Sequence, residues 1–368
     1  MNYKKKILHL ITGLEVGGAE TMLLKILPPT KDTADHHVCS ITGVGPIGDK
    51  LTAAGIPVHH LDLTHSLDLT IIPKLRKLIL AIKPDVLITY LPHADILGRI
   101  IGKATGVPTI IGSVRVRLTK SKYLPFFFLD GLTSPLVSHY HFNSQTIANI
   151  HHSLLNINSK KITVIPNAIN IKKYNINLNV DNKKSSLGIE PNKTVIGCVA
   201  RLRKQKGHPN LIAAFDRVQQ KRPDTVLALI GDGEEKENIL SEIKTRNLQD
   251  KVIMLGNRHD VAEILQIIDI FALTTLYEGM SNSIMEAMAA KRPIVTTDIP
   301  ENRELITHDH TGMLVPVGNN QATAQVLIEL IDNPQKRLKL GQAAYQEVAD
   351  KLSMDAIIPR YKAFYESI

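Results

Sequence analysis

Tryptophan is absent from this chain of 368 residues, and aromatic residues make up only 4% of it. A module that binds sugars by stacking them on exposed aromatic rings is therefore disfavoured. Cysteine is nearly absent too: Cys39 and Cys198 each lie in an apolar run typical of a strand. Because the two fall in different halves of the chain, we expect buried thiols in a reducing compartment rather than a disulfide.

Long apolar runs are also missing, since no stretch approaches the ~20 residues that a membrane span needs. The first six residues include Lys4, Lys5 and Lys6, and the apolar run that follows is too short for a signal peptide. We expect a cytoplasmic protein whose first strand is Ile7–Thr12.

Acidic residues are scarce in the first half of the chain. Residues 1–172 hold 19 lysines and arginines against 10 aspartates and glutamates, whereas the remainder holds 25 of each sign. The whole net charge of +9 therefore belongs to the first half. A one-sided positive charge indicates a polyanionic partner, namely an anionic membrane, nucleic acid or phosphorylated substrates.

Short apolar runs alternate with helix-period segments along most of the chain. This pattern predicts βαβ units, parallel sheets and an α/β fold class. The predicted strands include Val86–Tyr90, Thr194–Val199 and Thr225–Ile230, and the predicted helices include Ile71–Ile82 and Asn210–Lys221.

The alternation is interrupted once, between Ile171 and Ser186, where the sequence is rich in Asn and Lys. We therefore predict a first doubly wound domain at 1–172, a linker at 173–186, a second such domain at 187–350 and a terminal helical segment at 351–368. The end of the chain, Tyr345–Ile368, is predicted to be helical with a break near Pro359. Two such domains would face each other across a cleft, with ligands at the carboxyl ends of the strands.

Gly17 and Gly18 join the first predicted strand to the first predicted helix. Glycines let backbone amides approach an anion at a helix N-terminus. The pattern is not G-x-G-x-x-G, which disfavours a nicotinamide cofactor. A plain tight turn explains the pair equally well.

Arg201 and Lys206 follow the first strand of the second domain, within the run Arg201–Gly207. A guanidinium and an ammonium group that converge on one anion suit a diphosphate. The alternative is a solvated basic loop.

Glu278 and Glu286 are the most informative pair, eight residues apart. We predict Glu278 in a loop after a strand, holding sugar hydroxyls, and Glu286 about one turn into a helix, accepting ribose hydroxyls. The residues between them would form a helix N-terminus whose amides bind phosphate; they include Gly279, Met280, Ser281, Asn282 and Ser283. A capping motif with one surface glutamate remains the alternative.

Asn257 and Arg258 also follow a predicted strand and precede a predicted helix. Their backbone is placed to bind the edge of a nucleobase. Asp232, in a turn after another strand, is interpreted as structural.

Together these segments resemble family 4 of the retaining glycosyltransferases, which have the GT-B fold of two facing Rossmann-like domains with a cleft between them. The resemblance covers most of the chain, and its most specific element is the spacing of Glu278 and Glu286. The other segments are Gly17–Glu20, Phe142–Ser144, Ile165–Ala168, Arg201–Gly207 and Leu255–Glu304.

The resemblance implies that Arg201 and Lys206 hold the donor diphosphate, and that Glu278 with the amides after it engages the transferred sugar. It implies further that Gly17 and Gly18 approach the donor from the first domain, that His93 lies near the sugar, and that the last helix crosses back to the first domain. A capping or packed histidine is the alternative for His93.

The sequence departs from the family at three places: Asn167-Ala168, Lys291-Arg292-Pro293 and Pro300-Glu301-Asn302. We expect the first to change only a turn, and the other two to lie near the donor pocket.

The expected reaction transfers a sugar with retention of configuration from a nucleotide-diphosphate sugar, which is a substrate, so that no cofactor is required. No D-x-D motif stands in a suitable place, so we expect no metal. The expected acceptor is a lipid-linked, polysaccharide or lipopolysaccharide precursor. The alternatives are a nucleotide-sugar 2-epimerase of the same fold and a catalytically inactive, membrane-associated partner.

The stretch Ser113–Leu132 combines four cations with a run of aromatic residues. Cations beside exposed aromatics suit an anionic bilayer, so we expect peripheral binding to the inner face of the cytoplasmic membrane through Arg115, Arg117, Lys120 and Lys122. The alternative is that the Phe126–Leu129 run is the buried face of a helix. We find no nucleic-acid-binding module, and so expect no nucleic-acid partner.

Overall fold

The computed structural model describes residues 4–63, 65, 68–115 and 124–368. The chain divides into two compact units. The first unit contains residues 1–168 together with Met354–Ile368, and the second contains Ile169–Ser353.

The first unit is built on a parallel sheet of seven strands in the order β3-β2-β1-β4-β5-β6-β7. Parallel strands are covered on both faces, and accordingly their residues are almost continuously apolar. The strands are β1 (Lys5–Ile11), β2 (Ala34–Ser40), β3 (Val58–His60), β4 (Val86–Tyr90), β5 (Thr109–Val114), β6 (His139–Phe142) and β7 (Ile162–Val164).

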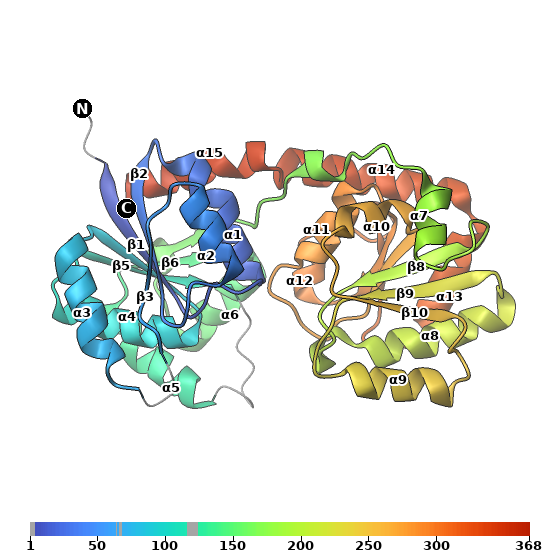
Figure 1. Ribbon diagram of the computed structural model, residues 1–368, viewed down its shortest axis with the longest axis horizontal. Helices are drawn as coiled ribbons and strands as arrows, with labels where there is room; N and C mark the ends of the chain where they lie inside the picture. Colours follow the sequence, from blue (N-terminus) through green and yellow to red (C-terminus); the bar gives the residue numbers. More distant parts are fainter. Residues whose placement is uncertain (1–3, 64, 66–67, 116–123) are drawn as a thin grey trace. The chain divides into compact units, whose positions relative to one another are not determined.

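Helices cover both faces of this sheet (Figure 1). Alternate residues of β1 show the two sides: Ile7 and Ile11 pack against α1 (Gly18–Ile26), α2 (Gly45–Ala53) and α15 (Met354–Ser367). Leu8 and Leu10 pack against α3 (Ile71–Ile82) and α4 (Pro92–Ala104) on the opposite face. The helices α5 (Leu124–Thr133) and α6 (Gln145–Leu155) complete that layer, and short 3-10 helices span Pro28–Thr30, Ser134–Leu136 and Ser159–Lys161.

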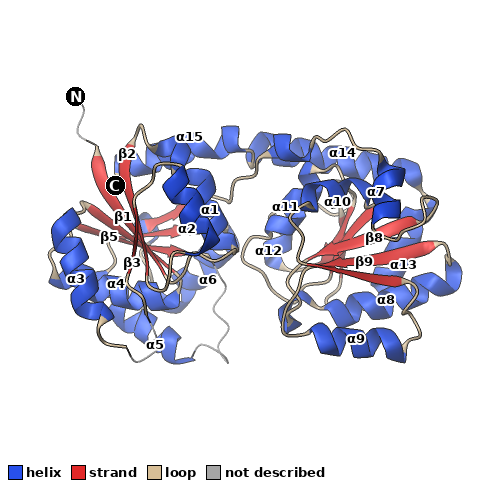
Figure 2. Cartoon of the chain, viewed as in Figure 1, coloured by secondary structure: helices blue, strands red, loops and turns tan. Residues whose placement is uncertain are grey.

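The second unit repeats the architecture of strands covered by helices (Figure 2). Its parallel sheet has six strands in the order β10-β9-β8-β11-β12-β13. Its strands are β8 (Thr194–Val199), β9 (Thr225–Ile230), β10 (Val252–Gly256), β11 (Ile270–Leu273), β12 (Ile294–Thr297) and β13 (Met313–Val315). One face carries α8 (His208–Lys221), α9 (Lys236–Thr245) and α13 (Asn320–Asp332); the other carries α7 (Val180–Ser186), α10 (Val261–Ile267), α11 (Asn282–Ala289) and α14 (Pro334–Lys351). The short elements η4 (Ile171–Tyr174), η5 (Lys204–Lys206) and α12 (Pro300–Arg303) lie in connecting segments.

The strand order reverses between β1 and β4 in the first unit, and between β8 and β11 in the second. In such sheets the connections leave in opposite directions at this point, which opens a crevice at the carboxyl ends of the strands. The segments after β1 and β4, and after β8 and β11, are therefore the places to look for a ligand site.

Two sequence predictions about the ends of the domains were wrong. The segment predicted as a linker, 173–186, contains α7 and belongs to the second unit. The break in the C-terminal helical segment falls at Leu352–Ser353, between α14 and α15, whereas Pro359 lies inside α15. The last helix is part of the first unit.

Candidate functional site

Close backbone packing joins the segments that follow β8 and β11. Gly207 has a φ of +67°, and a Cβ added there would lie 2.1 Å from the carbonyl oxygen of Thr274. The Thr274 hydroxyl donates to the Gly207 carbonyl oxygen at 2.9 Å. Only glycine tolerates both the backbone conformation and this approach, so Gly207 fixes one segment against the other.

Gln205 extends the same junction. Its side-chain amide donates to the carbonyl oxygen of Tyr277 at 2.7 Å, and its own carbonyl oxygen accepts from the Leu276 amide at 2.8 Å. The Thr275 hydroxyl also donates to that carbonyl, at 3.0 Å. The two segments therefore form one hydrogen-bonded platform at the carboxyl edge of the sheet.

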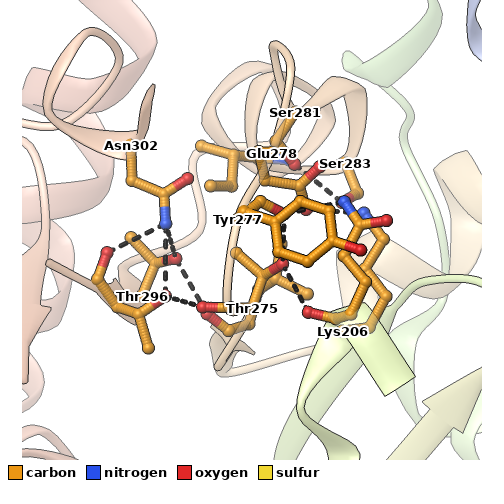
Figure 3. Close-up of polar contacts among 12 residues, drawn as sticks. Lys206, Thr275, Tyr277, Glu278, Ser281, Ser283, Thr296 and Asn302 are labelled. Atoms are coloured by element: carbon orange, nitrogen blue, oxygen red, sulfur yellow. Dashed lines mark hydrogen bonds and ion pairs between the residues drawn. The ribbon is translucent and has the colours of Figure 1, made fainter. Parts of the chain in front are cut away.

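Lys206 and Glu278 meet on this platform (Figure 3). The Lys206 Nζ atom lies 2.5 Å from Glu278 Oε1, and Glu278 is only 6% exposed. A buried carboxylate needs such a partner, because an unpaired charge in the interior is costly. Two predicted site residues, 72 positions apart in sequence, are thus brought into direct contact.

The N-terminus of α11 follows immediately. Ser281 is its N-cap residue, with Oγ accepting from the Ile284 amide at 3.5 Å and lying 3.3 Å from the Ser283 hydroxyl. Gly279 and Met280 precede the cap and are partly exposed, as is Asn282 at the first helical position. The predicted helix N-terminus is therefore formed by these residues, beside the Lys206–Glu278 ion pair.

Glu286 lies in the next turn of α11, where its carboxylate accepts a hydrogen bond from the Tyr174 hydroxyl. Burial, followed by the charge and hydrogen bond of Glu286, raises the pKa of Tyr174. Tyr174 lies in η4, within the segment predicted as a linker, and was therefore missed. An isolated tyrosine in a run rich in Asn and Lys gives no sequence pattern that predicts this contact.

Arg201, Asn257 and Arg258 are all exposed beyond the carboxyl ends of β8 and β10. The Arg258 guanidinium makes two hydrogen bonds to Asp260, at 2.8 and 2.7 Å. The hydrogen bond from Arg258, followed by that from Lys183, lowers the pKa of Asp260. Arg258 is therefore already held by a carboxylate of its own loop.

The departures from the family pattern have separate explanations. Asn302 is fully buried, and its side-chain amide donates to Thr296 Oγ1 and to the Thr297 carbonyl oxygen, each at 2.9 Å. The Thr297 hydroxyl in turn donates to the Thr275 carbonyl oxygen at 2.5 Å, which ties β12 to the platform.

Lys291 and Arg292 lie at the amino end of β12, so the expectation that they border the donor pocket was wrong. Arg292 donates there to the carbonyl oxygens of Ala290, Gln266 and Ile268. This edge of the sheet is opposite to the one where ligands bind.

The predicted residues of the first unit lie at the start of two helices. Gly17 precedes α1, and Gly18 is its first residue. His93 is exposed in the first turn of α4, just after Leu91, whose φ of +72° is strained for a residue with a branched side chain. Strained backbone is common at functional sites, but the role of His93 stays a prediction.

Arg115 corrects a prediction, because it is 8% exposed and cannot face a bilayer. It donates to Asn167 Oδ1 at 2.9 Å and to the Tyr361 hydroxyl at 3.2 Å. The other predicted membrane contacts, Arg117, Lys120 and Lys122, lie outside the described residues.

Within the described part of the chain, no three His, Cys, Asp or Glu side chains come together in a group that could hold a metal ion. Over the same residues, no helix has the length and apolar character needed to cross a bilayer.

Two family models match consecutive parts of the sequence. The model for "Glycosyltransferase Family 4" matches residues 16–173, and that for "Glycosyl transferases group 1" matches residues 179–347. The chain is 26% identical to the Escherichia coli UDP-Gal:alpha-D-GlcNAc-diphosphoundecaprenol alpha-1,3-galactosyltransferase, over 90% of this chain and 89% of that protein. It is also 26% identical to the Staphylococcus aureus capsular polysaccharide biosynthesis glycosyltransferase CapM, over 99% and 97% of the two chains.

Solved structures share the fold at lower sequence identity. The structure of Anabaena Alr3699/HepE with UDP and glucose superposes with a TM-score of 0.90 at 22% identity, covering 99% of this chain and all of the other. Its complex with UDP-glucose gives a TM-score of 0.89 at 23% identity, with the same coverage. The two family models together span almost the whole chain, and with this agreement in fold they establish that it belongs to the family 4, group 1 glycosyltransferases with the GT-B fold.

Proposed function

We propose that this chain is a retaining, metal-independent glycosyltransferase that transfers a sugar from a UDP-sugar to a lipid-diphosphate-linked or polysaccharide precursor. The observation that carries the proposal is the Lys206–Glu278 ion pair beside the N-terminus of α11. Together they place an ammonium group, a carboxylate and helix-end amides at one edge of the sheet. A sugar attached to a diphosphate presents complementary groups, namely hydroxyls and anionic oxygens.

The reaction breaks the bond between the anomeric carbon and the diphosphate oxygen, and forms a bond between that carbon and an acceptor hydroxyl oxygen. The acceptor proton ends on the departing diphosphate. Negative charge develops on the diphosphate in the transition state, where Lys206, Arg201 and the α11 amides would stabilise it. An ammonium group has three N–H donors, so Lys206 can contact phosphate while it remains bound to Glu278.

The proposed route is attack by the acceptor on the face from which the diphosphate leaves, which preserves the anomeric configuration. The cations Lys206 and Arg201 would supply at the diphosphate the positive charge that a metal provides elsewhere. Nuclear magnetic resonance of the glycosidic product tests retention directly. Activity that is abolished by EDTA and restored by Mn²⁺ would contradict metal-independent transfer.

The choice of UDP is supported by the ligands of the Anabaena neighbour and by the UDP-galactose donor in the name of the E. coli relative. The acceptor class is supported by the same relative, whose named acceptor is a diphosphoundecaprenol-linked sugar, and by the capsular polysaccharide enzyme. We propose a bacterial-type envelope or capsule precursor on this basis.

A screen of nucleoside diphosphates and UDP-sugars by thermal shift tests the donor site first, because ligand binding to the folded state raises its apparent stability. We expect a selective increase in melting temperature with UDP that is reduced in Glu286→Ala. A transferase should release UDP from a UDP-sugar only when an acceptor is added. A 2-epimerase would instead convert the nucleotide-sugar without an acceptor. No response to any nucleotide would favour an inactive partner protein.

We propose in addition that α5 touches an anionic membrane on the cytoplasmic side. Phe128 and Leu132, one turn apart on α5, are 67% and 61% exposed. Exposed apolar side chains on a helix of a positively charged domain suit the interface of an anionic bilayer.

A further inference from the structure

Arg115 is a buried cation at the carboxyl edge of the first-unit sheet. It directly follows β5, and its guanidinium lies 5.7 Å from the centre of the Tyr90 ring. Its hydrogen-bond partners among the described residues, Asn167 and the Tyr361 hydroxyl, are neutral. Its Nε atom is buried and donates no hydrogen bond within the described residues.

Arg99 of the same unit provides an internal comparison. It is also buried and also lies 5.7 Å from a tyrosine ring, that of Tyr140. Unlike Arg115, it has two carboxylates, with Asp130 at 2.5 Å and Asp95 at 3.9 Å. Over the residues that the structure places, one buried guanidinium is therefore compensated by acidic side chains and the other is not.

No acidic residue that the structure describes fills this role for Arg115. In the described part of the chain, its hydrogen bonds go to Asn167 and Tyr361 and none goes to a carboxylate. The residues outside the described part contain no Asp or Glu in the sequence. The charge of Arg115 affects two neighbouring histidines. Burial is the main cause of the lowered pKa of His141 and of His9, and the charge of Arg115 lowers both further.

Asn143 lies beside Arg115 at the same edge. Val114 and Phe142 are paired in adjacent parallel strands, and each of the two polar residues directly follows one of them. Asn143 is 3% exposed, yet its Oδ1 atom accepts no hydrogen bond within the described residues. A buried unsatisfied acceptor costs free energy unless a ligand or water donates to it.

We propose that the carboxyl edge of β5 and β6 is a subsite for a phosphate-linked sugar, in which Arg115 binds phosphate oxygens and Asn143 accepts a sugar hydroxyl. An anionic ligand would supply the counter-charge that the chain lacks, and guanidinium groups suit phosphate oxygens. The inference rests on the proposed function, since the ligand would be the phosphate-bearing end of the acceptor. It narrows the acceptor class to sugars linked to phosphate or diphosphate.

The first test is a thermal-shift titration of the full chain with inorganic pyrophosphate in the presence of saturating UDP. We expect the melting temperature of the wild type to rise, and Arg115→Met to bind pyrophosphate roughly ten- to a hundredfold more weakly. Repeating the titration on Lys206→Ala removes a binding contribution from the second unit. An unchanged response in Arg115→Met, or none in the wild type, would overturn the proposal.

The melting temperature of the variants distinguishes phosphate binding by Arg115 from a purely structural role. Replacing an uncompensated buried charge by an apolar side chain of similar length is expected to leave the melting temperature equal or higher. The matched variant Arg99→Met should lower it, because two buried carboxylates lose their partner. If Arg115→Met instead lowers the melting temperature and keeps the pyrophosphate response, Arg115 only holds α15 through Tyr361.

A second titration identifies the ligand class, using inorganic phosphate against the 1-phosphates of glucose, galactose and N-acetylglucosamine. We expect at least one sugar phosphate to bind more tightly than phosphate alone, and Asn143→Leu to remove that difference. Equal binding of all four would contradict the sugar part of the proposal. If UDP does not bind, the proposed function is refuted. The effects of Arg115→Met on pyrophosphate binding and on the melting temperature can still be interpreted in that case.

Discussion

The contact between Lys206 and Glu278 is proposed to serve both stability and chemistry. The carboxylate is almost fully buried and depends on the ammonium group for its charge compensation. We expect Lys206→Met to lower kcat/KM about 10²–10³-fold, the usual effect of removing one transition-state donor. It should also lower the free energy of unfolding by about 3 kcal/mol, because Glu278 is left buried and unpaired. Steady-state kinetics and urea unfolding measure the two effects.

The double variant Lys206→Met/Glu278→Gln separates the effect on activity from the effect on stability. A neutral amide removes the buried unpaired charge, so stability should return towards that of the wild type while activity does not. Lys204→Ala is the control, since Lys204 is exposed in the same 3-10 turn. Recovery of activity in the double variant would show that Lys206 acts only by supporting the fold.

Tyr174 carries the second prediction at this scale. Its hydroxyl donates to Glu286, and a hydrogen bond to a charged group typically contributes about 1.5–3 kcal/mol. We expect Tyr174→Phe to raise the KM for the nucleotide-sugar about tenfold with little change in kcat, because Glu286 would be less well oriented towards the ribose. Tyr345→Phe in α14 is the control. A fall in kcat with an unchanged KM would place Glu286 near the reacting carbon instead.

A site residue can be predicted from the sequence when the short segment around it has a recognisable pattern. Lys206, Glu278 and Ser281 lie in strand-end loops with recognisable spacing, and the structure brings them together. Tyr174 contacts Glu286, which lies more than a hundred residues later in the sequence, so no local pattern predicts the contact. The sequence predicts a membrane contact for Arg115 because cations beside aromatic residues suit a bilayer, whereas Arg115 is buried and donates a hydrogen bond to Tyr361 from the far end of the chain.

At the scale of elements, strands buried on both faces were the most predictable. The bounds of β4, β8 and β9 agree with the predicted ranges, because continuous apolar runs between turn residues are distinctive. Helix α7 was missed because its sequence is polar. It is held by tertiary contacts instead, with Lys183 Nζ at 2.7 Å from Asp260 and 2.5 Å from Glu263 of the α10 region.

Helix α5 is the element whose proposed function, membrane binding through its exposed side chains, is most directly testable. We expect the variant Phe128→Ser/Leu132→Ser to lose most of its flotation with anionic liposomes, because about 1.5–3 kcal/mol of apolar burial is lost for each side chain. Binding should already be weak in the wild type when the liposomes carry no anionic lipid.

Leu338→Ser is the matched control for α5, since Leu338 is 61% exposed but lies in α14 of the second unit. Loss of flotation in this control as well would assign binding to general surface hydrophobicity. Equal flotation of the wild type with neutral and anionic liposomes would refute the electrostatic part of the membrane proposal.

At the scale of the whole molecule, histidines with a lowered pKa are unequally divided between the two units. Burial is the main cause of a lowered histidine pKa at six positions of the first unit: His9, His36, His59, His139, His141 and His151. In the described part of the second unit only His208 is shifted in this way, to about 4. The pKa of His36 is also lowered to about 4. The stability of the first unit should therefore depend more strongly on pH.

The direction follows from which state takes up protons first. As pH falls below the unfolded value of 6.5, the unfolded chain binds protons that the folded state refuses, so stability present above pH 6.5 is lost towards pH 4. Asp95 opposes this in part, because burial raises its pKa to about 6 and its contribution grows as pH falls from about 6 to about 4. Counting only the three most buried histidines, we expect the first unit to lose about 2–4 kcal/mol between pH 7.5 and 5.5.

Differential scanning calorimetry at pH 7.5 and 5.5, with and without UDP, measures this difference. UDP should raise only the transition of the second unit and so identify it. The other transition should move to lower temperature on acidification, and the double variant His9→Gln/His36→Gln should reduce that movement, because the amides do not titrate. If the UDP-sensitive transition is the one that falls at pH 5.5, the buried histidines do not control the acid stability of the molecule.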